Sequence, residues 1–250
     1  MHRHGSHPRK TSSCPMYADR PHSKRGFVEL PTALVAHLES WIGAWPPPSD
    51  GVTLVEARSR HEPEWDGRVR PVRGVRTPEG TVIGVPPGSL ALARTAGSTL
   101  EELEEHLPEV LGYPGWRIYE GVFRWSDDPI PFDTPGSWRP SHDPTLPDWL
   151  RPFNAPVLVA VEGGEIVAGV GRKVHDRYGQ ELAVVTEADH RGRGWAKRLI
   201  SQAALQVIEE GAIPTYLHAP GNEASARTAD AAGFPDRGWS ILGLYPGSPG

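Results

Sequence analysis

Apolar residues in the first half of the chain recur at helical spacing in two segments. The first predicted helix begins at Pro31 and ends at the prolines after Trp45, and its apolar face carries Leu34, Val35, Leu38, Trp41 and Ile42. The capping-box pattern Ser98-Thr99-Leu100-Glu101 predicts the start of a second, acidic helix. The apolar positions of that helix are Leu100, Leu103, Leu107 and Leu111.

Strand patterns accompany these helices. Residues 52–57 and 81–85 match the pattern of short strands, and residues 116–125 alternate between apolar and polar positions. The stretch from residue 58 to residue 77 is polar and has no period, so we expect it to be irregular.

The second half of the chain has a regular order of elements. A predicted hairpin at residues 157–162 and 165–170 turns at Gly163-Gly164. A strand at 181–186, a glycine-rich loop and a helix at 195–210 follow. The last elements are a strand at 213–218, a helix at 222–232 and a strand at 239–245. The predicted order is β-β-β-α-β-α-β.

Two further segments show neither the helical nor the strand spacing of apolar residues. Residues 1–25 are basic and polar and predict a disordered tail, and residues 126–147 are rich in Asp and Pro and predict a linker. We therefore divide the chain into the tail at 1–25, an N-terminal α/β region at 26–125, the linker at 126–147 and a second domain at 148–250.

Composition narrows the class of protein. The 250 residues are 38% hydrophobic and 23% charged, with no apolar run long enough for a membrane helix and no apolar segment of a secretory signal, so we expect no membrane association. The single cysteine, Cys14, excludes a disulfide framework and a cysteine-rich zinc site, and we expect no metal and a cytoplasmic location. The net charge is −5 although the first 25 residues are basic, so the folded part is acidic and a general nucleic-acid binder is disfavoured.

The sequence Arg191-Gly192-Arg193-Gly194-Trp195-Ala196 lies between a predicted strand and a predicted helix. Glycines let the backbone turn tightly there, and free amides at the start of the helix favour anions. The arginines add positive charge and bidentate donors. Such a turn suits a pyrophosphate, although neither the Walker pattern nor GxGxxG is present. Taken alone, the motif also fits a solvent-facing turn or a short RNA-binding patch.

The longer pattern around this motif resembles the GNAT family, the GCN5-related N-acetyltransferases. The acetyl-CoA motif of that family, (Arg/Gln)-x-x-Gly-x-(Gly/Ala), is matched by Arg191, Gly194 and Ala196. The family's later Asn-x-x-Ser/Ala helix ends in Gly-Phe, and it is matched by Asn222, Ser225, Gly233 and Phe234. The resemblance covers residues 148–245 and includes the order of elements. It implies an α/β fold with a mixed central sheet flanked by helices in the C-terminal half.

The resemblance also implies that acetyl-CoA is the co-substrate, and it assigns binding residues. In the family, the backbone of the strand before the loop pairs with the pantetheine arm, and the matching residues are Val184, Val185 and Thr186. The pyrophosphate would lie on the amides of Arg191, Gly192, Arg193, Gly194, Trp195 and Ala196, with Lys197 nearby. Asn222 and Ser225 would bond to the cofactor arm.

Acetyl transfer to an amine needs a base, because amines are mostly protonated at neutral pH. Family members often place a carboxylate on the strand before the loop, and Glu181 is the matching catalytic candidate. An exposed glutamate at a strand end is the structural alternative. His175, Asp176 and His218 are weaker candidates for a base or a water relay.

One position departs from the family pattern. Many members have a tyrosine seven residues after the Asn, which is thought to protonate the leaving thiolate, but this chain has Ala229 there. Either Tyr216, Tyr178 or water takes that role, or the thiolate leaves without help, or the chain binds acyl-CoA without turning it over.

We therefore favour an acetyl-CoA-dependent N-acetyltransferase that transfers an acetyl group directly to a primary amine of a small molecule or peptide. The alternative is a non-catalytic acyl-CoA-binding or regulatory protein with the same fold. The acidic folded part favours a cationic acceptor. For residues 27–125 three interpretations stay open: a degenerate GNAT-like copy, which we favour, a substrate-recognition domain, or a dimerisation surface that would make the protein a homodimer.

Overall fold

The computed structural model describes Met1 and residues 30–48 and 50–247. The predicted disordered tail lies outside these residues, apart from Met1. In the described part, ten strands form one mixed sheet in the order β1-β3-β2-β10-β4-β9-β8-β7-β6-β5. The strands are β1 Val52–Glu56, β2 Arg73–Thr77, β3 Gly80–Val85, β4 Trp116–Trp125, β5 Ser137–Arg139, β6 Val157–Glu162, β7 Glu165–Val174, β8 Gly179–Thr186, β9 Ile213–His218 and β10 Ser240–Pro246.

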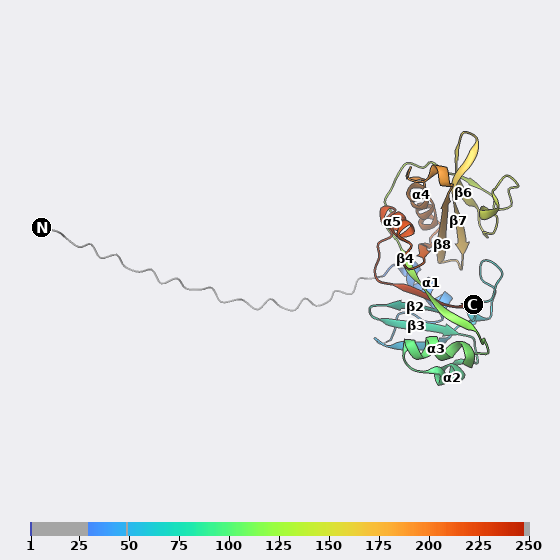
Figure 1. The fold of residues 1–250 in the computed structure, drawn as a ribbon, viewed down its shortest axis with the longest axis vertical. Coiled ribbons are helices and arrows are strands. Elements are labelled where there is room, and N and C mark those ends of the chain that lie inside the picture. The colour runs from blue at the N-terminus through green and yellow to red at the C-terminus, as the bar shows by residue number, and fades with distance from the viewer. Residues whose placement is uncertain (2–29, 49, 248–250) are drawn as a thin grey trace.

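Helices cover both faces of this sheet. They are α1 Thr32–Ile42, α2 Leu90–Ala93, α3 Leu100–Val110, α4 Trp195–Glu209 and α5 Glu223–Ala231. Four short 3-10 turns add to them at η1 Arg58–Arg60, η2 Arg94–Ala96, η3 Asp148–Leu150 and η4 Ala188–His190. Figure 1 shows α4 and α5 beside β6–β8 at one end of the molecule and α2 and α3 beside β2 and β3 at the other.

The alternation of side chains along the strands separates the core into layers. On β10, Ile241 packs in the cluster that α1 covers, whereas Leu242 and Leu244 pack in the cluster under α3. The apolar face of α4 forms a third cluster with Leu182 of β8 and Tyr216 of β9. Helix α1 therefore covers one face of the central strands, and α3, α4 and α5 cover the opposite face.

Strand β4 joins the two halves of the chain. It pairs antiparallel with β9 on one side and with β10 on the other. Strand β10 in turn pairs with β2 of the N-terminal half. The proposed domain boundary at residue 126 therefore falls between strands of one continuous sheet, and the division of the chain into domains stays a prediction. This topology does not confirm a degenerate GNAT-like copy in the N-terminal half.

The sequence patterns located most elements, and the structure corrects three details. Residues 73–77, in the stretch expected to be irregular, form β2, which is mostly buried between β3 and β10. The Asp/Pro-rich segment 126–147 contains the short edge strand β5. The capping box of α3 uses Thr99 and Glu102, one residue later than the pattern suggested.

A buried group of charges fixes the segment between β1 and β2 to the sheet. The Glu64 carboxylate accepts hydrogen bonds from Arg60 and Arg73 and forms an ion pair with Arg70 at 3.1 Å. The Arg60 side chain is fully buried, and it also donates to the Trp41 carbonyl oxygen at the end of α1. Burial alone would raise the pKa of Glu64, but the bond and charge of Arg73 outweigh it and lower the pKa to about 2.

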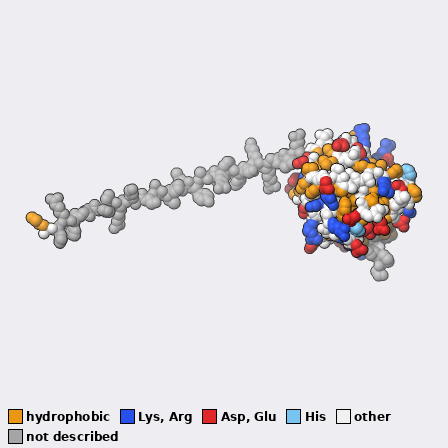
Figure 2. Space-filling view, turned by 90° about the horizontal axis from the view of Figure 1, so that it is seen from above, with side chains coloured by type: hydrophobic (Ala, Val, Ile, Leu, Met, Phe, Trp, Pro, Cys, Tyr) orange, Lys and Arg blue, Asp and Glu red, His pale blue; other side chains and the backbone are white. Residues whose placement is uncertain are grey.

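On the face seen in Figure 2, acidic and basic side chains are interspersed among apolar and uncharged ones. Within the described residues, no helix combines the length and apolar character that crossing a bilayer requires.

Candidate active site

Strands β8 and β9 separate along their length. Their parallel pairing runs from Gly179 with Ile213 to Glu181 with Thr215 and stops there, although β8 continues to Thr186 and β9 to His218. The other edge of β8 stays paired with β7 as far as Thr186. Beyond Glu181, the edge of β8 that faces β9 therefore offers free backbone groups to an extended ligand. We call this opening between the strands the splay.

The residues predicted to pair with the pantetheine arm line the splay. Val184, Val185 and Thr186 are the last residues of β8, and Val185 is 42% exposed, an unusual value for an apolar residue on a central strand. The Thr186 hydroxyl is buried and has no hydrogen-bond partner among the described residues. These features fit a polar, extended ligand.

The loop after β8 leads into the N-terminus of α4. Gly192 and Gly194 have φ angles of +75° and +77°, which residues with a side chain rarely adopt. Glycine is required at these positions by the backbone angle and not by a lack of space. An added Cβ at Gly192 meets nothing within 4 Å, and one at Gly194 meets only the Lys197 side chain. In the described part of the chain, the backbone amides of residues 192–197 have no acceptor. Six free amides at a helix start form a site for an anion.

The side chains of the loop are held by the protein itself. Arg191 donates to the Thr186 carbonyl oxygen at 3.2 Å, and Arg193 donates to Glu162 at 3.0 Å. The Trp195 indole N–H is buried beside the loop without a partner among the described residues. The fit to a phosphate group therefore rests mainly on the amides.

Helix α5 presents the second predicted cofactor contact. Asn222 is its N-cap, and its side-chain oxygen accepts the Ser225 amide at 3.1 Å. Tyr216 is the first residue of β9 beyond the part paired with β8, and burial raises the pKa of its hydroxyl. Ala229 is fully buried in the same cluster as Tyr216. Ala229 is therefore part of the core, and its side chain supplies no proton donor at this position.

Glu181 is buried at the apex of the splay. Its carboxylate forms an ion pair with Lys173 and lies 3.4 Å from His175 Nε2. Burial would raise the pKa of Glu181, but the bond from His175 and the charge of Lys173 lower it to about 2. Glu181 is therefore ionised at neutral pH, and it retains a proton poorly.

A buried cluster beside Glu181 comes from both halves of the chain. His175 Nε2 faces Glu181, and the His37 Nδ1 atom of α1 lies 2.9 Å from Asp176. Burial lowers the pKa of His175, which keeps its ring neutral at pH 7. The sequence suggested His175 and Asp176 but not His37, which lies on the apolar face of α1 between Leu34 and Trp41. A polar residue within an apolar helical face is the signal that could have identified it.

The remaining candidates have structural partners. His218 accepts a hydrogen bond from Arg124 on one nitrogen, and its other nitrogen lies 3.0 Å from the Ala219 carbonyl oxygen. Tyr178 contacts Arg177 near the start of β8.

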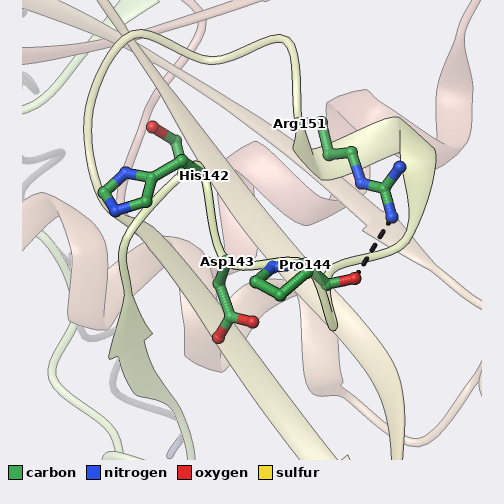
Figure 3. A pocket seen from close by; sticks show the side chains of 5 residues that line it. His142, Asp143, Pro144 and Arg151 are labelled. Atoms are coloured by element: carbon green, nitrogen blue, oxygen red, sulfur yellow. Dashed lines mark hydrogen bonds between the residues drawn. The ribbon is translucent and has the colours of Figure 1, made fainter.

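Two surface hollows lie outside the splay. One of about 430 Å³ is lined by Ser141, His142, Asp143, Pro144 and Arg151, in the loop between β5 and β6. Figure 3 shows Arg151 bonded to the Pro144 carbonyl oxygen across this loop. The second lies beside residues 126–128 and the end of α5. Within the described residues, no group of His, Cys, Asp or Glu side chains forms a metal site.

A comparison with protein families identifies one family whose model matches the segment that contains this site. Residues 119–234 match the model of the acetyltransferase (GNAT) family. A search of curated proteins finds no match.

Three solved structures are similar at low identity. A protein of Novosphingobium aromaticivorans assigned to the GNAT family is 22% identical, with a TM-score of 0.44 over 54% of this chain and 69% of that one. A GCN5-related N-acetyltransferase-like protein of Streptococcus suis is 16% identical, with a TM-score of 0.42 over 66% and 71%. The protein yncA of Salmonella typhimurium, solved with its cofactor acetyl-CoA, is 21% identical, with a TM-score of 0.29 over 38% and 69%.

The matched segment begins within β4 and ends after α5, so it contains both the splay and the loop before α4. The chain therefore carries a domain of the GNAT acetyltransferase family at residues 119–234.

Proposed function

We propose that this protein is an acetyl-CoA-dependent N-acetyltransferase that acts on a primary amine of a small molecule or peptide. The observation that supports this most is the combination of the splay with six free amides at the start of α4. An extended arm and a pyrophosphate need these two features side by side, and the family match covers both.

In this proposal acetyl-CoA is bound by the residues predicted from the sequence, except that the Arg191 amide already donates to the Ala188 carbonyl oxygen at 3.3 Å and the Lys197 amide takes its place. The pyrophosphate contacts the amides of residues 192–197, and the pantetheine arm pairs with the free edge of Val184, Val185 and Thr186. The thioester then lies in the splay, near its apex at Glu181.

Direct transfer makes the amine nitrogen attack the thioester carbonyl carbon. The nitrogen must first lose a proton, and the oxyanion that develops needs donors, which backbone amides of β8 supply. The Glu181 carboxylate attracts the ammonium group and receives its proton only transiently, because its pKa is about 2. Collapse of the tetrahedral intermediate releases the thiolate of CoA, which takes up a second proton from the nitrogen.

A second function is favoured by one specific feature. Ala229 stands where many GNAT enzymes have a tyrosine, and it is fully buried in the core. A non-catalytic acyl-CoA-binding protein would need the same splay and loop but no proton donor at this place.

A free-thiol assay on the purified chain tests the proposal. Acetyl-CoA is mixed with a panel of polyamines, aminoglycosides, lysine peptides and neutral amines, and products are confirmed by mass spectrometry. We expect amine-dependent thiol release and an acetylated product with at least one cationic amine. Tight binding of acetyl-CoA without thiol release across the panel would instead support the non-catalytic function.

A further inference from the structure

Strand β1, Val52–Glu56, forms one edge of the sheet, and in the described part of the chain only one of its two sides is paired. The Gly51 carbonyl oxygen just before the strand and the Ala57 amide just after it both bond to β3 or its ends. Odd-numbered residues of β1 therefore turn their backbone groups toward β3, and even-numbered residues turn theirs outward. Among the described residues, the backbone groups left without a partner are those of Val52, Leu54 and Glu56.

The side chains along this edge leave it open to a second strand. The sequence of β1 is Val-Thr-Leu-Val-Glu, and it has no lysine, proline or bulge, which are the features that commonly protect an exposed edge. Residues 52–55 are all partly exposed, and Leu92 of α2, the helix that contacts β1, is 52% exposed. The Glu56 carboxylate is bonded within its own chain, because it accepts the Gly88 amide at 2.9 Å. The edge thus combines apolar surface with free backbone groups.

The other edge of the sheet is protected. Strand β5 has only three residues, Ser137–Arg139, and it lies between Pro135 and Pro140. Its Arg139 side chain donates to the Thr145 hydroxyl. A short strand that carries a charge and is flanked by prolines is a poor partner for a further strand. Pairing of β1 with β5 of another copy would also repeat without end and form a filament, whereas pairing of β1 with a second β1 forms a closed dimer.

We propose that β1 is the interface of a homodimer, in which two copies pair antiparallel through this strand around a two-fold axis. Leu54 is the middle one of the three outward residues, so an axis beside Leu54 lets every outward backbone group bond. Leu54 then faces Leu54 of the second copy, and Val52 faces Glu56 of the second copy. The two Glu56 residues lie at opposite ends of the paired strands, about 14 Å apart, so their repulsion is largely screened.

This dimer leaves the splay of each copy open. Five strands separate β1 from β8 in the sheet. Figure 1 shows α2, which contacts β1, at the opposite end of the molecule from α4. The dimer therefore does not depend on the proposed function, and its test needs no acetyl-CoA. It gives the N-terminal half of the chain the role of a dimerisation surface.

Sedimentation velocity of the full chain over a concentration series tests the dimer, and we expect a species of twice the mass of the chain. Leu54→Lys places two ammonium groups opposite each other at the axis, and it should raise the dissociation constant of the dimer by about 10-fold or more. Val69→Lys is the matched control, because Val69 is also an exposed apolar residue but lies in the loop before β2. It should leave the dimer intact. Circular dichroism checks that both variants fold.

A disulfide tests the register, with the chain's single cysteine removed by Cys14→Ser. Facing residues of a hydrogen-bonded antiparallel pair have Cα atoms about 5.5 Å apart, which a disulfide can bridge. The Thr53 positions of the two copies lie about 8 Å apart, which is beyond its reach. Oxidation should therefore link Leu54→Cys into a covalent dimer and leave Thr53→Cys unlinked.

A wild-type chain that stays monomeric at every concentration would overturn the dimer. A dimer that Leu54→Lys leaves intact, or that Thr53→Cys links as readily as Leu54→Cys, would overturn this interface. If Leu54→Lys does not fold, hydrogen exchange of the wild-type chain decides. On dilution the amides of the three outward residues should exchange faster, while the Thr53 and Val55 amides, which face β3, should not change. Outward amides that stay protected in a monomer would show that another segment of the chain covers β1, and would also overturn the dimer.

Discussion

Substitution of Gly194 tests the anion site at the start of α4. Its φ angle of +77° means that any side chain is strained there, by about 1–2 kcal/mol. An added Cβ meets only the flexible end of Lys197, at 3.3 Å, so steric overlap adds little. Gly194→Ala and Gly194→Glu should therefore lose similar stability, and their difference in acetyl-CoA binding isolates the charge.

The size of that difference follows from electrostatics. A carboxylate about 5 Å from a phosphate, at an effective dielectric constant of about 20, is repelled by about 3 kcal/mol. This corresponds to a loss of affinity of about 100-fold or more. Calorimetric titration with acetyl-CoA measures it, and thermal unfolding checks that both variants fold.

Gly88→Glu is the matched control. Gly88 has a φ angle of +78° and open space around its Cβ position, but it lies in the loop before α2. It should lose stability and keep acetyl-CoA affinity. If Gly194→Glu binds acetyl-CoA as tightly as Gly194→Ala, the amides of this loop do not hold the pyrophosphate.

Three further predictions concern buried charges and a helix cap. The pKa of Glu181 in the folded state lies below its usual value of 4.5, so the ionised carboxylate stabilises the protein above pH 4.5, and this stabilisation is lost as the pH falls toward 2. Glu181→Gln should therefore flatten the loss of stability in acid unfolding. It should also lower the acetylation rate with little change in the affinity for acetyl-CoA. An acid-unfolding profile identical to that of the wild type would contradict this. Glu64→Gln leaves three buried or half-buried arginines without their shared carboxylate, and urea unfolding should show a loss of about 3–5 kcal/mol; a loss below about 1 kcal/mol would show that the pairs contribute little. Thr99→Ala should destabilise the protein by about 1 kcal/mol and Ser98→Ala by clearly less, because Thr99 caps α3; equal effects would reject this cap.

Local patterns predicted most of the elements because each depends on neighbours in sequence. The alternation at residues 116–125 gave β4 its bounds, and the apolar face at 195–210 gave α4. The pattern could not indicate that β4 would lie between β9 and β10, since strand order depends on contacts between distant residues. Strand β2, Arg73–Thr77, was missed because two of its five residues are arginines. The buried Arg73 is tolerated because it pairs with Glu64 and donates to the Tyr245 hydroxyl.

In the candidate site, too, the features built from neighbouring residues could be predicted, and those that depend on distant contacts could not. The glycines and the helix start after β8 were visible in the sequence, because the anion site is built from consecutive residues. Glu181 was recognisable by its position, but its burial with Lys173 and His175 depends on the register of β7 against β8. His37 and Trp41 come from α1, more than a hundred residues away, and only the fold brings them beside His175.

The central claim is that the amides of residues 192–197 hold the pyrophosphate of acetyl-CoA. The most direct measurement is a paired calorimetric titration of the wild-type chain with acetyl-CoA and with acetylpantetheine, which lacks the phosphates. The account predicts saturable binding of acetyl-CoA and much weaker binding of acetylpantetheine. Equal affinities, or no binding of acetyl-CoA, would contradict it.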